Sequence, residues 1–190
     1  MDTQTWDALV ASMKNAYAAD LAQGRAPRPV IMPLVRGELV GLIRLRPAEA
    51  GQDAVTAIVE LSNVAAAAGA DEVVLAWDTQ NVAAECGLPV VGPAPCLNLV
   101  HATKDGHVLH QLPCTYESGE SSPEGPGPVE PRWLAAPGPQ PGGELAPPVQ
   151  AALTYSFTPL DLDHPSPFGV TVLLMEDDGY AVHLTDTFAL

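Results

Sequence analysis

Two histidines, His101 and His110, have the spacing in this sequence that most clearly suggests a chemical role. They flank Asp105-Gly106, which is typical of the turn of a hairpin formed by residues 97–103 and 107–116. A two-residue turn there places His101 opposite His110 as a non-hydrogen-bonded pair, with Cβ atoms roughly 4.5–5.5 Å apart. Two imidazoles at that separation can share one transition-metal ion such as zinc.

A catalytic zinc site usually needs a third protein ligand, and the sequence does not single one out. The histidines belong to neither an HExxH helix nor a CxxC pair. The alternative is that both are half-buried and form hydrogen bonds with the backbone or with each other. The residues that could supply the third ligand, if the tertiary fold brings them close, are Cys114, His183, Asp161, Asp163 and His164.

The sequence lacks the common motifs of nucleophilic and phosphate chemistry. It has no GxSxG motif, no Walker A or GxGxxG loop, and only two lysines, Lys14 and Lys104. We therefore expect no nucleotide or dinucleotide cofactor. Cys86, Cys96 and Cys114 form neither an even set nor a CxxC motif, which indicates reduced structural thiols.

The charge of the chain is strongly negative and unevenly distributed. The 190 residues include 8 basic and 23 acidic ones, for a net charge of −15. Residues 1–47 hold six basic and four acidic residues, a net charge of +2, whereas residues 48–190 hold two basic and nineteen acidic residues, a net charge of −17. This field repels phosphate groups and disfavours nucleic-acid binding. We expect a cationic partner to prefer residues 48–190.

No targeting or membrane segment is predicted. Asp2, Asp7 and Lys14 interrupt the first residues, which have no basic region followed by an apolar one, as a signal peptide would. No stretch approaches the roughly 18–20 apolar residues of a membrane span. We therefore expect a soluble, cytoplasmic protein that does not bind membranes.

Apolar periodicity predicts the elements of the first half. From Trp6 to Leu21 the apolar residues recur at spacings of three and four, which predicts a helix. Residues 30–35 and 39–45 are β-rich and predict a hairpin. Because Pro29 and Pro33 cannot donate hydrogen bonds, the first of these strands lies either at a sheet edge or with those positions facing away from its neighbour. A second helix follows from Asp53 to Gly69. Residues 73–77 are continuously apolar, as in a strand that is covered on both faces.

Expectations for the second half are more varied. The prolines and glycines of residues 79–95 predict an irregular connection with one helical turn near 82–86. Residues 145–155 could form a short helix, although 154–157 would suit a strand equally well. Residues 170–175 and 180–184, separated by Asp177-Asp178-Gly179, predict a further hairpin.

Residues 118–148 are rich in proline and glycine, which predicts a long loop or insertion. Trp133 and Leu134 are its main large apolar side chains. The segment is either a solvated excursion with no binding role or a partner-binding segment anchored by these two residues.

The order of elements predicts one α+β domain over residues 1–190. We expect an antiparallel or mixed sheet, built largely from hairpins, with two or three helices packed on one face. The leading functional hypothesis is a non-enzymatic protein-interaction or assembly module without a cofactor, which binds a protein partner or itself. The alternative is a metal-binding protein or metal-dependent hydrolase that uses His101 and His110.

Overall fold

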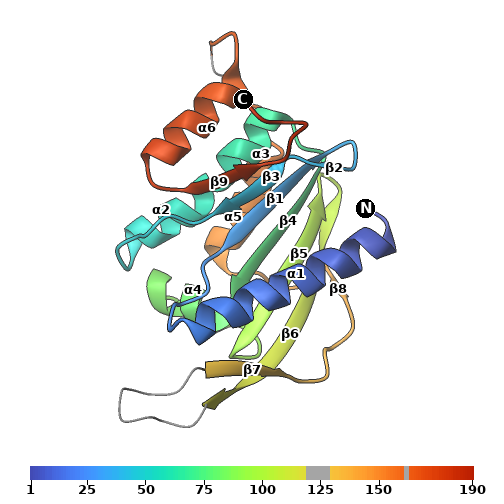
Figure 1. Cartoon of the computed structure of the whole chain (residues 1–190), viewed down its shortest axis with the longest axis vertical. Helices are drawn as coiled ribbons and strands as arrows, with labels where there is room; N and C mark the ends of the chain where they lie inside the picture. Colours follow the sequence, from blue (N-terminus) through green and yellow to red (C-terminus); the bar gives the residue numbers. More distant parts are fainter. Residues whose placement is uncertain (119–128, 161–162) are drawn as a thin grey trace.

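An antiparallel β-sheet runs through the computed structural model, which describes residues 1–118, 129–160 and 163–190 (Figure 1). Along the sheet the strand order is β7-β6-β5-β4-β1-β3-β9, while β2 pairs with β1 and β8 pairs with β6. The bounds are β1 Val30–Val35, β2 Glu38–Leu39, β3 Gly41–Arg44, β4 Glu72–Asp78, β5 Cys96–Thr103, β6 Gly106–Ser118, β7 Val129–Trp133, β8 Gln140–Pro141 and β9 Ala181–Leu184. Every neighbouring pair is antiparallel, which confirms the predicted α+β class.

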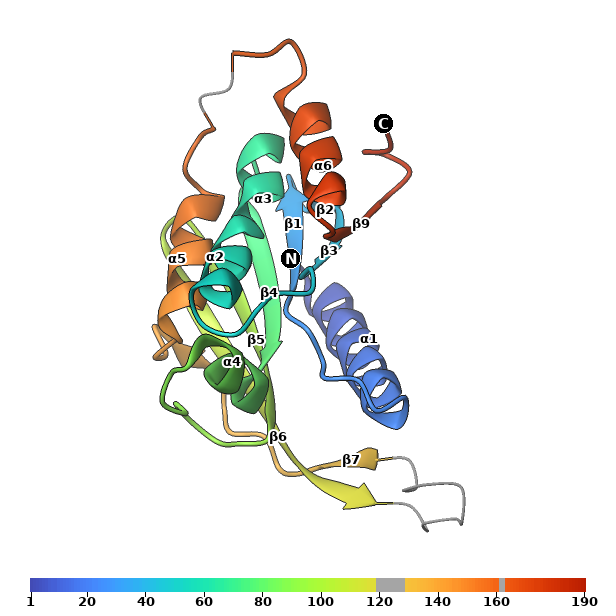
Figure 2. The same cartoon turned by 90° about the vertical axis from the view of Figure 1, so that its left-hand side faces the viewer.

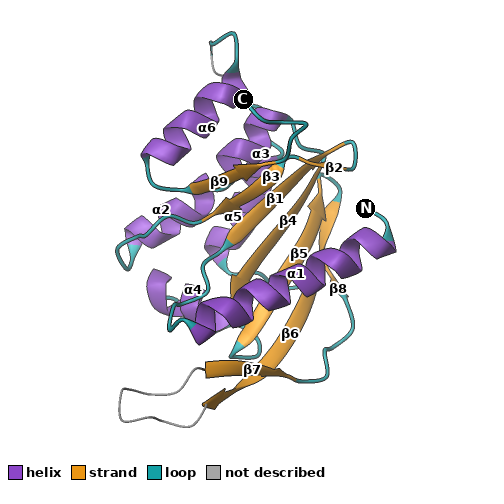
Figure 3. Ribbon diagram, viewed as in Figure 1, coloured by secondary structure: helices purple, strands orange, loops and turns teal. Residues whose placement is uncertain are grey.

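Helices lie on both faces of this sheet (Figures 2 and 3). Their bounds are α1 Thr3–Ala22, α2 Gln52–Glu60, α3 Ser62–Ala68, α4 Thr79–Cys86, α5 Pro147–Ser156 and α6 Pro167–Asp177. Helices α2, α3, α4, α5 and α6 share one apolar core with the sheet, so the helices gathered on this face outnumber the two or three that were predicted. Helix α1 contradicts the expectation that the helices lie on one face, because its side chains Met13 and Tyr17 form a second core on the opposite face. None of the helices in the described residues is long and apolar enough to cross a membrane.

Strand β4 is the predicted central strand, and both of its faces are covered. Val73, Val74 and Leu75 are fully buried. Because side chains alternate along a strand, Val73 and Leu75 join the core beneath α2 and α3, whereas Val74 joins the core beneath α1. A continuous apolar run thus accounts for helices on both sides of the sheet.

Of the two alternatives for residues 30–35, the sheet edge is wrong, and Pro33 instead faces away from the neighbouring strand β4. Strand β1 is an interior strand, hydrogen-bonded to β4 on one side and to β2 and β3 on the other. The carbonyl of Pro33 accepts a hydrogen bond from Val40 N–H, so the side on which proline lacks its own N–H faces the break between β2 and β3. The ladder to β4 therefore loses no donor, and proline is tolerated there.

The hairpin of β5 and β6 is present, but its register differs from the prediction by two residues. Thr103 pairs with Gly106, which places Lys104 and Asp105 in the turn. His101 therefore pairs with Val108, and His110 pairs with Leu99. A shift of two residues keeps every side chain on its predicted face.

The proline- and glycine-rich segment contains strands in its described part. Val129–Trp133 forms β7, which pairs with the end of β6, and Gln140–Pro141 forms β8. A loop over the whole of residues 118–148 is therefore the wrong description for 129–133 and 140–141, and residues 119–128 lie outside the described part. Strand β7 is the last strand on its side of the sheet, where prolines cost few ladder hydrogen bonds.

The predicted hairpin at residues 170–184 is also wrong. Residues 170–175 belong to helix α6, and β9 pairs with β3 instead. Pro167 starts the helix, and its buried residues Thr171, Val172 and Met175 follow helical spacing. Packing against the core has overridden the strand propensity of this valine-rich run. Residues 147–156 form helix α5, the first of the two alternatives for that segment.

A buried carboxylate links the two faces at the end of β4. Asp78, with 1% of its surface exposed, caps α4 through a 2.7 Å bond from Asn81 N–H and accepts a 2.7 Å bond from the Tyr17 hydroxyl. The hydroxyls of Tyr17 and Tyr116 lie 3.0 Å apart. Burial, followed by hydrogen bonds to Tyr116 and Asp78, raises the pKa of Tyr17 far above its ordinary value, so Tyr17 remains a neutral donor.

We predict that Tyr17→Phe lowers the free energy of unfolding by about 1–3 kcal/mol, because Asp78 would keep its burial and lose a donor. Chemical denaturation monitored by circular dichroism measures the change. Tyr155→Phe is the matched control, because the Tyr155 side chain is 53% exposed. Equal losses in the two variants would contradict a structural role for this hydrogen bond.

Candidate functional site

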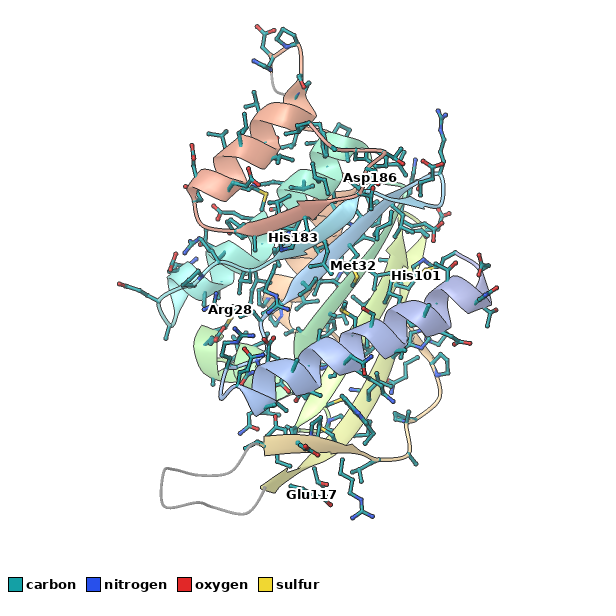
Figure 4. The ribbon with its side chains drawn as sticks, in the orientation of Figure 1. Arg28, Met32, His101, Glu117, His183 and Asp186 are labelled. Atoms are coloured by element: carbon teal, nitrogen blue, oxygen red, sulfur yellow. The ribbon has the colours of Figure 1, made fainter. Side chains whose placement is uncertain are left out.

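The predicted histidine pair lies beneath the N-terminal half of α1. The Trp6 ring is centred 4.4 Å from the His110 ring and 6.1 Å from the His101 ring. Figure 4 shows His101 beside this helix. Both histidines therefore lie on the face predicted from the hairpin, and they help to hold α1 against β5 and β6.

His101 interacts with an acidic side chain. Its Nε2 lies 2.7 Å from a carboxylate oxygen of Glu72, which also accepts a 3.0 Å bond from the amine of Met1. Burial would raise the pKa of Glu72, but the bonds from Met1 and His101 outweigh it and hold this pKa below the ordinary value. The interactions of His101 thus resemble the hydrogen-bonded alternative, although its partner is a side chain that the sequence did not indicate.

The structure does not bring the predicted third metal ligands to this pair. Cys114 lies four residues beyond His110 on β6, about 13 Å along a strand, and its sulfur is 3.9 Å from the Tyr17 hydroxyl. His183 lies on β9, four strands from β5, or roughly 19 Å across the sheet. The structure therefore does not place Cys114 or His183 beside the histidine pair.

Acidic loop residues do not complete a metal site either. Asp163 and His164 are exposed residues between α5 and α6, and Asp161 lies outside the described part of the chain. Within residues 1–118, 129–160 and 163–190, no group of three or more His, Cys, Asp or Glu side chains is arranged to hold a metal ion. Metal binding by His101 and His110 remains a prediction.

Trp133 and Leu134, the predicted partner-binding residues, differ in their surroundings. The Trp133 ring is centred 5.5 Å from the Tyr17 ring, and Lys14 Nζ lies 4.8 Å from its centre. Trp133 therefore packs against α1 within the molecule. Leu134 is 49% exposed, and partner binding at this residue remains a prediction.

The geometry at the other end of the sheet suggests a site that the sequence analysis did not identify. Strand β9 pairs with β3 on one side, and no strand of the described chain pairs with its other side. Thr185 N–H, one residue after β9, donates to Val40 O, one residue before β3. Because successive residues alternate, the N–H and C=O groups of Val182 and Leu184 point away from β3. These groups form an open sheet edge.

The helix beside this edge carries an exposed leucine, Leu173. Helix α6 packs along β9, and its residue Leu173 is 57% exposed, whereas the equally exposed Leu174 lines a hollow with Glu60 and Asn63 of α2 and α3. Val182 and Leu184, in contrast, point their side chains toward the core that α6 covers. We use the name β9–α6 surface for the open edge of residues 181–184 together with Leu173.

The charge around the β9–α6 surface is negative. Four acidic residues flank β9 along the chain, and none forms an ion pair within the described residues: Glu176, Asp177, Asp178 and Asp186. The nearby cations Arg44 and Arg46 are paired with Asp20 and Asp53. The sequence contained a signal for this site, because no lysine or arginine follows Arg132.

Comparison with known proteins gives no family assignment. No family model matches the chain, and no curated protein or solved structure matches it either. Functional inference therefore depends on the geometry of the described residues.

Acidification should weaken the docking of α1 on the histidine pair. Burial, and then the charge of His101, lowers the pKa of His110 below its ordinary value. The stability that neutral His110 contributes is therefore present above about pH 6.5, the unfolded value, and is lost as the pH falls through the folded pKa. Glu72 loses its contribution separately, below its ordinary pKa of 4.5.

We predict that His110→Phe reduces the fall in unfolding free energy between pH 7.5 and pH 5.5. Phenylalanine keeps an aromatic ring against Trp6 but cannot take up a proton, and one proton contributes at most about 1.4 kcal/mol per pH unit. Denaturant unfolding at several pH values measures the slope. His183→Phe, at an exposed position, should keep the original pH dependence, and an unchanged slope for His110→Phe would refute the assignment.

Proposed function

We propose that this protein is a non-enzymatic interaction module that binds a basic, extended segment of a protein partner as an additional strand beside β9. The open edge formed by the backbone groups of Val182 and Leu184 carries the proposal. Strand addition at such an edge derives its affinity from main-chain hydrogen bonds and its specificity from alternate side chains. The site offers these groups rather than a nucleophile or an acid–base pair.

The surroundings of the edge favour a particular side-chain pattern in the partner. Residues of an added strand that point toward the helical face would meet Val182, Leu184 and the exposed Leu173 of α6, so apolar side chains fit there. Residues that alternate with them would point to the other face, where His183 is exposed. Lysine or arginine in the segment would meet the four unpaired acidic residues around β9.

The same charges argue against self-association through this edge. Two copies that pair their β9 strands would bring Asp177, Asp178 and Asp186 of both chains close together, and like charges at short range oppose association. Residues 30–35 cannot pair with a second copy as an edge strand either, because β1 is an interior strand. The proposal therefore names a basic partner rather than a second copy.

We predict that a short synthetic peptide in which lysine alternates with valine binds the full chain, and that a peptide with glutamate in place of lysine does not. Val182→Pro should weaken binding about fivefold to tenfold, because proline removes an outward N–H without removing a bond to β3. Fluorescence anisotropy of the labelled peptide measures both effects, and higher salt should weaken the binding.

Two further variants keep this test informative if Val182→Pro impairs folding. Leu173→Ser changes an exposed side chain of the β9–α6 surface and should weaken peptide binding while preserving stability. Leu134→Ser, the matched control, changes an exposed leucine near β7 at the other end of the sheet and should leave binding unchanged. Equal effects of the two serine variants, or equal binding of the lysine and glutamate peptides, would refute the proposal.

A further inference from the structure

A cavity of about 220 Å³ lies between the sheet, α4, the residues that follow α4 and the start of α5. Figure 2 shows α4 and α5 on the same side of the sheet. The cavity is smaller than the roughly 300–1,000 Å³ clefts that hold drug-sized ligands, so it fits a small molecule. Its wall is largely apolar and includes Val82, Leu88, Val91, Leu109 and Leu145.

A chain of polar side chains crosses the floor of this apolar cavity. Asn98 Nδ2 donates to Thr79 Oγ1 at 2.6 Å, and Gln140 Nε2 donates to Gln111 Oε1 at 2.9 Å. A longer bond of 3.5 Å, from Gln111 Nε2 to Asn98 Oδ1, joins the two pairs. Polar groups on the core-facing side of a sheet need partners to offset their desolvation, so their presence here is informative.

The existing hydrogen bonds of these side chains determine which of them can still bind a ligand. Asn98 is 2% exposed, and its amide also contacts the carbonyls of Trp77 and Cys96. Gln111 lines the cavity and uses its oxygen for Gln140, and one of its two N–H groups faces Asn98. Its second N–H has no partner within the described residues, so Gln111 can donate to an acceptor in the cavity.

One charged side chain lies at the rim of the cavity. Glu144 is the only charged residue among those that line the cavity in the described chain. Its segment is tied to β6, because Gly142 N–H donates to His107 O and His107 Nε2 donates to Gly143 O at 2.9 Å. A carboxylate held at the mouth of an apolar cavity favours a cationic group and opposes an anion.

We infer that this cavity binds a small apolar amine, with its hydrocarbon body among the apolar side chains and its ammonium group at Glu144. A hydroxyl or carbonyl oxygen on the ligand would accept a hydrogen bond from Gln111. The site is independent of the proposed β9–α6 surface, because its strand residues lie on β4, β5 and β6 whereas β9 lies at the other end of the sheet. Either proposal can therefore fail without the other.

Three matched probes test this site: phenethylamine, phenethyl alcohol and hydrocinnamate, which carry a cation, a neutral hydroxyl and an anion on similar aromatic bodies. In ¹H–¹⁵N spectra of the full chain, phenethylamine should shift the Gln111 side-chain amide saturably, with a Kd on the order of 1 mM or lower. The alcohol should bind more weakly and the carboxylate most weakly.

Two variants localise the effect. Glu144→Gln should weaken phenethylamine binding roughly threefold to fivefold and leave the alcohol unchanged, because only the ion pair is lost. Ala146→Leu should reduce the binding of both phenethylamine and phenethyl alcohol, because the larger side chain fills the cavity. Glu130→Gln, an exposed position on β7, is the control and should change neither. Absence of saturable binding, equal affinity for the amine and the carboxylate, or equal loss in Glu144→Gln and Glu130→Gln would overturn the inference.

Discussion

Burial of β4 on both faces is the constraint on which the rest of the structure depends. Its apolar side chains alternate between the two sides of the sheet, so neither face can be left to solvent. Helices α2, α3, α4, α5 and α6 cover one face, and α1 covers the other. Asp78 at the end of the strand then connects the two sides, because it caps α4 and accepts the hydroxyl of Tyr17.

This arrangement determines where polar groups can serve a partner. The backbone N–H and C=O groups of the interior strands are hydrogen-bonded to neighbouring strands. Free donors and acceptors therefore occur at the two edges of the sheet. At β9 such groups lie near the exposed Leu173 and a set of acidic side chains, and for this reason we propose a basic, apolar segment as partner rather than a second acidic copy. Over β5 and β6, in contrast, the amides of Asn98 and Gln111 line a cavity, for which we propose a small-molecule occupant.

Elements with strong local patterns could be predicted from the sequence. The helical spacing from Trp6 and the apolar run at residues 73–77 led to α1 and β4, and alternation placed both histidines on one face of their hairpin. The prolines left two alternatives open for residues 30–35, and pairing across the sheet decided between them: Pro33 is interior because its missing donor faces a break. Prediction failed at residues 170–175, which are helical because their buried side chains meet α3. The open edge of β9 could not be predicted, because pairing across the whole sheet determines which strand is last.

Amide hydrogen exchange in the free protein, resolved by NMR, tests the open edge most directly. If β9 has a free side, the N–H groups of Val182 and Leu184 exchange fast, whereas those of Ala181 and His183, which face β3, are protected. Addition of the lysine–valine peptide should then slow exchange at Val182 and Leu184. Protection of these two groups in the free protein, or no slowing when the peptide is bound, would contradict the proposal that β9 receives a partner strand.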